Sequence, residues 1–405
     1  MRINNYSLTK GFIALLSIFA IWNFMFTMTE TSWSGIVYVF LICLSVMICM
    51  LVLLYRPSRI STKLCLWLPF IVLIVIGNYK IGNFEGIIYY SICFALMLLS
   101  RYIDWNNMFP ERIIVVSGVI MIIGIWFQIL VPSVYNAYIA TFFKNTNDIL
   151  YWSNGYGYAG FTYQLGVTAI ILIYFEGIVI YSKFDDRKKQ IILLLLIIVC
   201  IFLTGKRAVA LLAILLPVID MLLSNRVTSK RTFNVLAVVS ILGVLVYFLA
   251  MNAELFIDSK VLGRFASTII DMENGQDISS HRSILYSEAI QLFNNNKLWG
   301  IGLGQYKELS QFGTDVHNSY LQVLCEMGIT GFVCYIVPLL VNLISCIKKN
   351  RYKDNKYLKV ALFIQLFFIL YGLTGNVSVN EFCFVFYFIS ISMTAGMNKF
   401  EGGII

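Results

Sequence analysis

Long apolar blocks separated by short polar breaks run through most of this chain. Each block is about 15–20 residues long, the length of α-helix that crosses a hydrocarbon core of roughly 30 Å. Hydrophobic residues fill 59% of the 405 positions and charged residues 13%, whereas a soluble domain carries about 25% charged residues. The sequence therefore excludes a water-soluble fold and predicts an all-α polytopic membrane protein.

The polar breaks predict about 12 transmembrane helices in three regions. Helices one to nine occupy 1–251, one large loop occupies 252–328, and helices ten to twelve occupy 329–405. The loop contains helical patches at Ser283–Phe293 and Ser319–Met327, so we expect a small helical cap. The predicted spans are 11–28, 35–55, 64–77, 84–100, 113–131, 159–181, 191–204, 208–223, 232–251, 329–347, 360–374 and 382–397.

The distribution of basic residues predicts the orientation of these spans. The N-terminus and alternate loops together hold 21 of the 30 lysines and arginines. Cytoplasmic loops carry the excess of positive charge, so we expect both termini in the cytoplasm. The opposite side then carries a moderate loop at about 132–158 and the large loop 252–328. The net charge of +9 is thus mainly an insertion signal, and nucleic acid is not an expected partner.

Two histidines, His281 and His317, both fall in the large loop. Histidine is the side chain best suited to take a proton near neutral pH, so each is a candidate general base, and His317 is the stronger one. A simpler interpretation also fits, because His317 directly precedes the helical patch and can serve to start that helix.

Arginines are few on the predicted outer side. Arg207 follows Lys206 in a short turn between two apolar spans, and Arg264 and Arg282 lie in the large loop. The planar guanidinium fork suits phosphate oxygens. Arg207 equally fits a cation that extends to the lipid–water interface, and Arg264 equally fits a solvated helix face.

Glycines mark two places where the backbone of the large loop changes direction. Gly300, Gly302 and Gly304 predict a tight passage between two helical pieces, since no phosphate-loop pattern surrounds them. Gly328 and Gly331 predict a bend where the loop helix meets the next span. The acidic residues show no spacing typical of metal ligands, so the sequence predicts neither a metal nor another cofactor.

The segment that closes the large loop resembles the signature of the O-antigen polymerase and O-antigen ligase superfamily. The resemblance is carried by His317–Leu321 followed by Glu326–Gly331, and by the preceding glycine segment Leu298–Gly304. Arg282 and Arg207 lie where that family places a loop arginine and an arginine after an apolar span. The order of these features, the dozen spans and the single large loop extend the resemblance over most of the chain.

Two departures from the family pattern are visible. The family often has Ser-Arg at the first arginine, whereas this chain has Gly205-Lys206-Arg207, which leaves open which cation meets the ligand. An aromatic residue, usually Trp, follows the loop arginine by four in the family, and here it is Tyr286.

The resemblance implies a GT-C-like membrane enzyme that transfers glycans without a metal or other cofactor. The donor would be an oligosaccharide on undecaprenyl pyrophosphate, and inversion at the anomeric carbon is expected. The implied roles are a catalytic base (His317), pyrophosphate contacts (Arg282, Arg207, Arg264, Lys206) and supporting residues (Asn318, Tyr286, Glu326).

The resemblance further implies a bacterial inner-membrane protein with its large loop in the periplasm. A repeat-unit polymerase is the first expectation, with an O-antigen ligase acting on lipid A-core as the alternative; Gram-positive capsule polymerases share the signature. The expected partners are the lipid-linked oligosaccharide and the bilayer, and the resemblance also admits a chain-length regulator and a flippase. On topology alone, twelve spans with both termini inside favour a lipid-linked oligosaccharide transporter, but the polar residues gather in one loop and no internal repeat is present. A membrane scaffold without chemistry is a further alternative.

Overall fold

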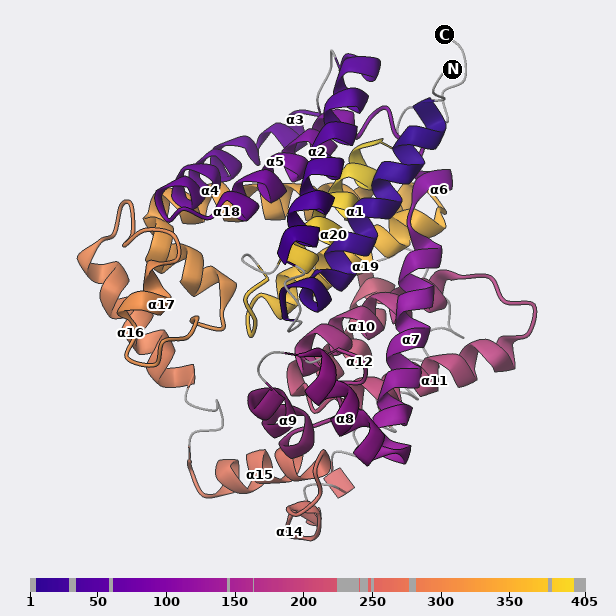
Figure 1. Cartoon of the computed structure of the whole chain (residues 1–405), viewed down its shortest axis with the longest axis vertical. Helices are drawn as coiled ribbons and strands as arrows, with labels where there is room; N and C mark the ends of the chain where they lie inside the picture. Colours follow the sequence, from indigo (N-terminus) through magenta and orange to yellow (C-terminus); the bar gives the residue numbers. More distant parts are fainter. Residues whose placement is uncertain are drawn as a thin grey trace. The chain divides into compact units, whose positions relative to one another are not determined.

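The computed structural model of the chain is built from α-helices (Figure 1). It describes residues 5–28, 34–57, 61–143, 146–162, 164–223, 240, 247–248, 251–276, 282–377 and 381–396. Every regular element within these ranges is a helix, which confirms the predicted all-α class. The helices are α1 (Asn5–Met28), α2 (Ser34–Tyr55), α3 (Thr62–Cys65), α4 (Leu68–Lys80), α5 (Phe84–Leu99), α6 (Trp105–Met108), α7 (Glu111–Leu130), α8 (Pro132–Phe142), α9 (Thr146–Gly155), α10 (Leu165–Tyr181), α11 (Arg187–Leu203), α12 (Arg207–Leu223), α14 (Ala253–Phe256), α15 (Leu262–Glu273), α16 (Arg282–Asn295), α17 (Gln305–Leu309), α18 (Ser319–Tyr352), α19 (Lys356–Tyr371) and α20 (Glu381–Gly396).

The chain divides into two compact units. Unit 1 combines Met1–Asn23, Ser34–Pro110 and Arg282–Ile405, and unit 2 combines Phe24–Trp33 and Glu111–His281. The predicted large loop contributes to both: α14 and α15 belong to unit 2, whereas α16, α17 and the start of α18 belong to unit 1.

Several helices have the length and composition of membrane spans, and the chain is a multi-pass membrane protein. The five that meet both criteria among the described residues are Asn5–Asn23, Gly35–Tyr55, Thr62–Lys80, Trp105–Leu130 and Ser319–Tyr352. Shorter apolar helices are Phe84–Leu99, Leu165–Tyr181 and Phe382–Gly396. The count of twelve spans and the GT-C-like arrangement stay predictions, and most of the expected span 232–251 lies outside the described residues.

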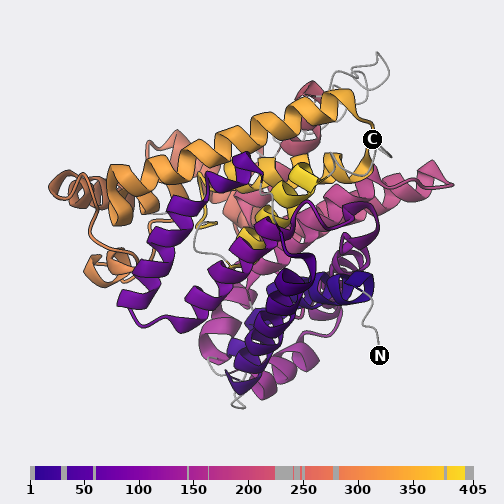
Figure 2. The same cartoon turned by 90° about the horizontal axis from the view of Figure 1, so that it is seen from above.

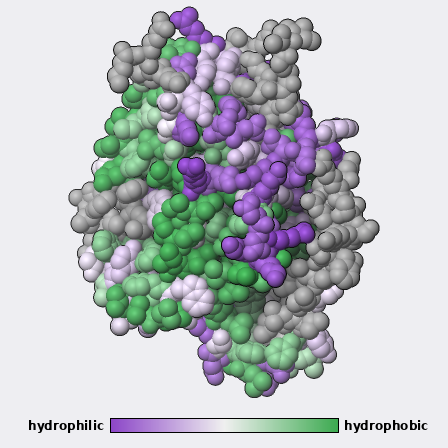
Figure 3. All heavy atoms as spheres, turned by 90° about the vertical axis from the view of Figure 1, so that its right-hand side faces the viewer, coloured by the Kyte–Doolittle hydropathy of each residue, from purple (hydrophilic) through white to green (hydrophobic). Residues whose placement is uncertain are grey.

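Helix α2 shows how a spanning helix distributes its side chains. One stripe, Val37, Leu41, Leu44, Ile48 and Leu51, is buried against the protein. The opposite stripe is equally apolar but exposed, with Val39, Ile42, Val46 and Leu53 on the surface. Because both faces are apolar, the outer stripe suits lipid rather than water. Broad apolar areas are also visible on the molecular surface in Figure 3.

Two local differences from the predicted elements have a physical reason. The expected span 64–77 is divided into α3 and α4, because Pro69 lacks an N–H donor and occupies the first turn of α4. The expected loop 132–158 contains α8 and α9, which bury Tyr135, Ile139 and Ile149 in a cluster of their own. Local packing thus makes this connection helical.

The core of unit 1 holds α18 against its neighbours. The fully buried Trp67 ring packs edge-on against Tyr335 of α18 and against Tyr387 of α20, with centroids 6.0 and 5.6 Å away. Lys63 Nζ also donates to Ser345 Oγ at 2.7 Å. Figure 2 shows α18 as a long rod whose N-terminal end lies beside α16 and α17. The candidate site is at that end.

Candidate functional site

The turn between α19 and α20, residues 372–375, anchors two predicted site elements of unit 1. Arg282, the first residue of α16, donates from Nη1 to the Thr374 carbonyl at 2.9 Å. Ser319, the first residue of α18, donates from its N–H to the Gly372 carbonyl at 2.8 Å and from Oγ to the Gly375 carbonyl at 2.9 Å. The beginnings of α16 and α18 are therefore tied to one short turn.

This shared anchor brings Arg282 and His317 into one neighbourhood. His317 is two residues before Ser319 and is half-buried. One helical turn after Arg282, the Tyr286 hydroxyl makes a long 3.5 Å contact to the His317 carbonyl. Asn318 caps α18, since its Oδ1 accepts from the backbone N–H groups of Tyr320 and Leu321, at 3.0 and 3.1 Å. The predicted base and loop arginine are thus positioned by the same elements.

Gly328 kinks α18, and backbone groups around the kink form hydrogen bonds with the glycine segment instead of within the helix. Gly328 has φ +65° and ψ −168°, which interrupts the helical ladder. The carbonyls of Cys325 and Glu326 accept instead from Ile301 and Gly302, at 3.0 and 2.8 Å. The N–H groups of residues 329 and 330 donate to the carbonyls of residues 297 and 298, at 2.8 and 3.3 Å. Four backbone groups at the kink are thus satisfied by the neighbouring segment.

The close approach of these two segments explains the glycines. A Cβ at Gly300 would overlap the backbone of Glu326 and Met327, and a Cβ at Gly328 would overlap the backbone of Leu298 and Trp299. The predicted tight passage and the bend at Gly328 are confirmed. The bend predicted at Gly331 is wrong, because Gly331 is helical and instead gives room to the Met327 side chain.

Glu326 and Gln322 form a buried polar pair on the first turns of α18. Glu326 Oε1 accepts from Gln322 Nε2 at 2.7 Å and from the Tyr306 N–H at 3.3 Å. Gln322 Oε1 accepts from the Val316 N–H at 2.9 Å. Both side chains are 2% exposed. Glu326 thus supports the site from inside the protein, and Gln322 is a participant that the sequence did not single out.

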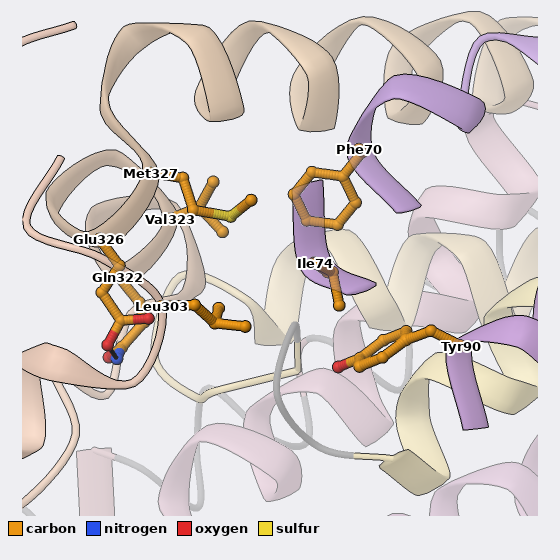
Figure 4. Close-up of a pocket in the computed structure, with 8 residues that line it drawn as sticks. All are labelled: Phe70, Ile74, Tyr90, Leu303, Gln322, Val323, Glu326 and Met327. Atoms are coloured by element: carbon orange, nitrogen blue, oxygen red, sulfur yellow. Dashed lines mark hydrogen bonds between the residues drawn. The ribbon is translucent and has the colours of Figure 1, made fainter. Parts of the chain in front are cut away.

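A recess lies beside this pair, between α4, α5 and α18 (Figure 4). It is partly open to solvent, and its free space, with the solvent at its mouth included, is about 270 Å³. Apolar side chains supply most of its wall, and Gln322 and Glu326 approach from one side. The glycine segment closes it through Leu303, which fits against Gly77 where a Cβ would collide. The lining residues are Phe70, Ile74, Tyr90, Leu303, Gln322, Val323, Glu326 and Met327.

The helices of unit 1 that follow Arg282 have a small core of their own. Ala289, Tyr306, Val316 and Cys325 are its buried members. The Tyr306 hydroxyl donates to Glu288 Oε2 at 2.9 Å, and Ser310 Oγ and the Gln311 N–H also donate to this carboxylate. Burial raises the pKa of Glu288, but these three hydrogen bonds outweigh it and hold the pKa below its ordinary value. Helices α16 and α17 are therefore fixed to each other, and they also pack against residues before and after His317.

The other predicted cations belong to unit 2 and lie around the turn that precedes α12. Arg207 donates from Nη1 to the Thr268 hydroxyl of α15, and Arg264 donates from Nη1 to the Gly205 carbonyl at 3.3 Å. Thr268 Oγ1 in turn donates to the Arg264 carbonyl at 2.7 Å. The Lys206 side chain extends over Gly166, and its Cε lies 3.6 Å from the position that a Cβ on residue 166 would occupy. Within unit 2, Arg207 and Arg264 are thus neighbours through α15.

Two tyrosines hold cations of this group by their ring faces. The Arg264 guanidinium lies 4.9 Å from the Tyr156 ring centre, and Lys260 Nζ lies 3.9 Å from that of Tyr158. Burial lowers the pKa of Lys260 to about 8. Lys260, four residues before Arg264, is not among the predicted site residues.

The described part of the chain holds no group of three His, Cys, Asp or Glu side chains that could bind a metal ion. His281 lies outside the described residues. The remaining predicted residues form two groups: Arg282, Tyr286, His317, Asn318 and Glu326 in unit 1, and Lys206, Arg207 and Arg264 in unit 2.

The comparisons with known proteins agree with the resemblance seen in the residues. No curated protein matches the chain. A family model described as O-antigen ligase matches residues 192–336, a stretch that contains all eight predicted site residues. Residues 192–336 therefore match an O-antigen ligase family domain, in agreement with the resemblance to the O-antigen polymerase and ligase superfamily.

Proposed function

We propose that this protein polymerises oligosaccharide repeat units carried on undecaprenyl pyrophosphate. The reaction is a metal-independent, inverting glycosyl transfer on the outer face of a bacterial inner membrane. The observation that carries the proposal is that Arg282 and Ser319, two residues after His317, are both anchored to the 372–375 turn, inside a stretch that matches this family. The donor and its membrane follow from the family and from the apolar helices.

The chemistry requires one base and one cationic group, which this pair supplies. The acceptor hydroxyl oxygen forms a bond to the anomeric carbon of the donor glycan. The bond from that carbon to the phosphate oxygen breaks, and its electron pair leaves with undecaprenyl pyrophosphate. The hydroxyl proton passes to a ring nitrogen of His317. Arg282 stabilises the negative charge that develops on the leaving pyrophosphate.

The cations of unit 2 are proposed as further contacts to the lipid-linked substrate. Arg207, Arg264 and Lys206 come from one turn and one helix. The link between Arg207 and Arg264 through Thr268 supports a phosphate-binding role, because fixed donors bind phosphate oxygens better than mobile side chains do. The twelve-span topology, with both termini in the cytoplasm and the large loop in the periplasm, completes the proposal.

Ligation is the second candidate, because the matching family model is described as an O-antigen ligase. A ligase uses the same donor and the same base but transfers the glycan to lipid A-core. Nothing in the residues of the large loop marks lipid A-core as the acceptor, so polymerisation is preferred.

A gel of surface polysaccharide from a strain that lacks the gene separates the candidates. We expect single repeat units on the core, in place of the ladder of long chains. A lipid-linked polymer with bare core would identify a ligase instead. Repeat units accumulating on the cytoplasmic face would identify a transporter and contradict the proposed chemistry. Restoring the gene on a plasmid serves as the control.

A further inference from the structure

His317 has a backbone conformation that needs outside support. Its φ of +58° is left-handed, and among the described residues only Arg56 shares this feature outside glycine. For an L-amino acid this conformation is strained, because Cβ comes close to the following carbonyl oxygen. Such conformations persist where the surroundings fix them, and they are frequent at functional sites. Contacts on both sides of His317 supply this support.

The C-terminal side is held by the 372–375 turn, through the hydrogen bonds that the N–H and the hydroxyl of Ser319 donate. The N-terminal side is held by a different chain of contacts. The Val316 N–H, directly before His317, donates to Gln322 Oε1 at 2.9 Å. Gln322 Nε2 donates onward to Glu326 Oε1 at 2.7 Å. The backbone at His317 is thus fixed from each direction.

The order of donors and acceptors in this chain admits one orientation of the Gln322 amide. The Val316 N–H can only donate, so the amide oxygen must face it, and the amide nitrogen then faces Glu326. Glu326 is itself held in place by the Tyr306 N–H at 3.3 Å. The two side chains involved, those of Gln322 and Glu326, are each 2% exposed. Water therefore offers little competition for these bonds.

We propose that Gln322 is a positioning residue, which transmits the fixed position of Glu326 to the backbone before His317 and so sets the direction of the imidazole. The inference rests on the proposed function for its catalytic consequence, but not for its structural part. It adds to the predicted site a residue that touches no substrate and acts only through His317.

The structural part is tested by NMR of the full-length protein with isotope-labelled histidine. The chain has two histidines, and His281→Asn identifies which signals belong to His317. We expect Gln322→Met, which keeps the side-chain length but removes both hydrogen bonds, to broaden or shift the His317 ring signals. Gln365→Met is the matched control, because Gln365 is also a buried glutamine of unit 1 and donates to Thr394 instead. Its His317 signals should match those of the wild type.

The catalytic part uses lipid-linked oligosaccharide extracted from the deletion strain as the probe. A misplacement of about 1 Å costs on the order of 10²-fold in rate, so Gln322→Met should lower kcat by about that factor and leave KM nearly unchanged. Glu326→Gln, which keeps an acceptor for the Gln322 amide, should retain more activity than Glu326→Leu. If Gln322→Met does not accumulate in membranes, Gln322→Asn, one carbon too short to bridge both partners, takes its place.

The outcomes separate the two levels of the proposal. Unchanged His317 signals in Gln322→Met would overturn the positioning role, whatever the activity. Equal losses of activity in Gln322→Met and Gln365→Met would show a general packing effect and would also overturn it. A wild-type protein that leaves the lipid-linked probe intact, while the NMR differences appear as expected, would overturn the proposed function alone.

Discussion

His317→Asn is expected to abolish long polysaccharide while leaving the amount of protein in the membrane unchanged. Asparagine tolerates the left-handed conformation that His317 adopts, so the backbone before α18 is preserved. Alanine would add strain at φ +58° and confuse loss of the base with loss of structure. Removal of a general base typically costs about 10²–10⁴-fold in rate, which is enough to eliminate long chains from a gel.

His281→Asn is the control for this prediction, since it changes the other histidine in the same way. Both variants are expressed in the deletion strain, and polysaccharide ladders are normalised to the protein detected in membranes. A full-length ladder from His317→Asn would remove the base assignment. A lost ladder from His281→Asn alone would move that assignment to the other histidine.

Arg282→Lys is expected to reduce polymerisation by about 10²-fold or more, although the charge is kept. One guanidinium nitrogen of Arg282 is already committed to the Thr374 carbonyl, and the fork leaves further N–H donors for phosphate oxygens. A lysine has a single ammonium group, which cannot hold the turn and form a bidentate phosphate contact with the same geometry. Loss of one well-placed donor to a developing charge costs about 10²–10³-fold.

The matched control is Arg187→Lys, which makes the same exchange at an exposed arginine at the start of α11. The ladder should be normal in that variant. Wild-type chain length in Arg282→Lys would show that Arg282 contributes only charge or only the anchoring of α16. Rates measured on extracted lipid-linked oligosaccharide distinguish a change in kcat from one in KM.

The helices and the kink were predictable from sequence because they follow from local patterns. The apolar blocks define the spanning helices. The loop helix at Ser283–Phe293 appears as α16, and the bend at Gly328 follows from the freedom of glycine at positive φ. The break before α4 was missed, although Pro69 signals it, because the apolar run continues on both sides of it.

The candidate site was only partly predictable, since its residue types are visible in the sequence but its contacts are not. His317 and Arg282 stand out by rarity and by the family signature. The 372–375 turn, which anchors Arg282 and the residue two after His317, is more than fifty residues away from either. Gln322 looks like an ordinary polar residue of a helix until its two hydrogen bonds are seen.

The most direct test of the account is a count of undecaprenyl pyrophosphate released by the purified protein. Wild-type protein and lipid-linked oligosaccharide are mixed without added metal, and released lipid diphosphate and glycan length are measured in the same reaction. The account predicts one lipid diphosphate for each new glycosidic bond, and neither product with His317→Asn. Polymer formed by His317→Asn at the wild-type rate, or glycans that stay one repeat long with the wild type, would contradict it.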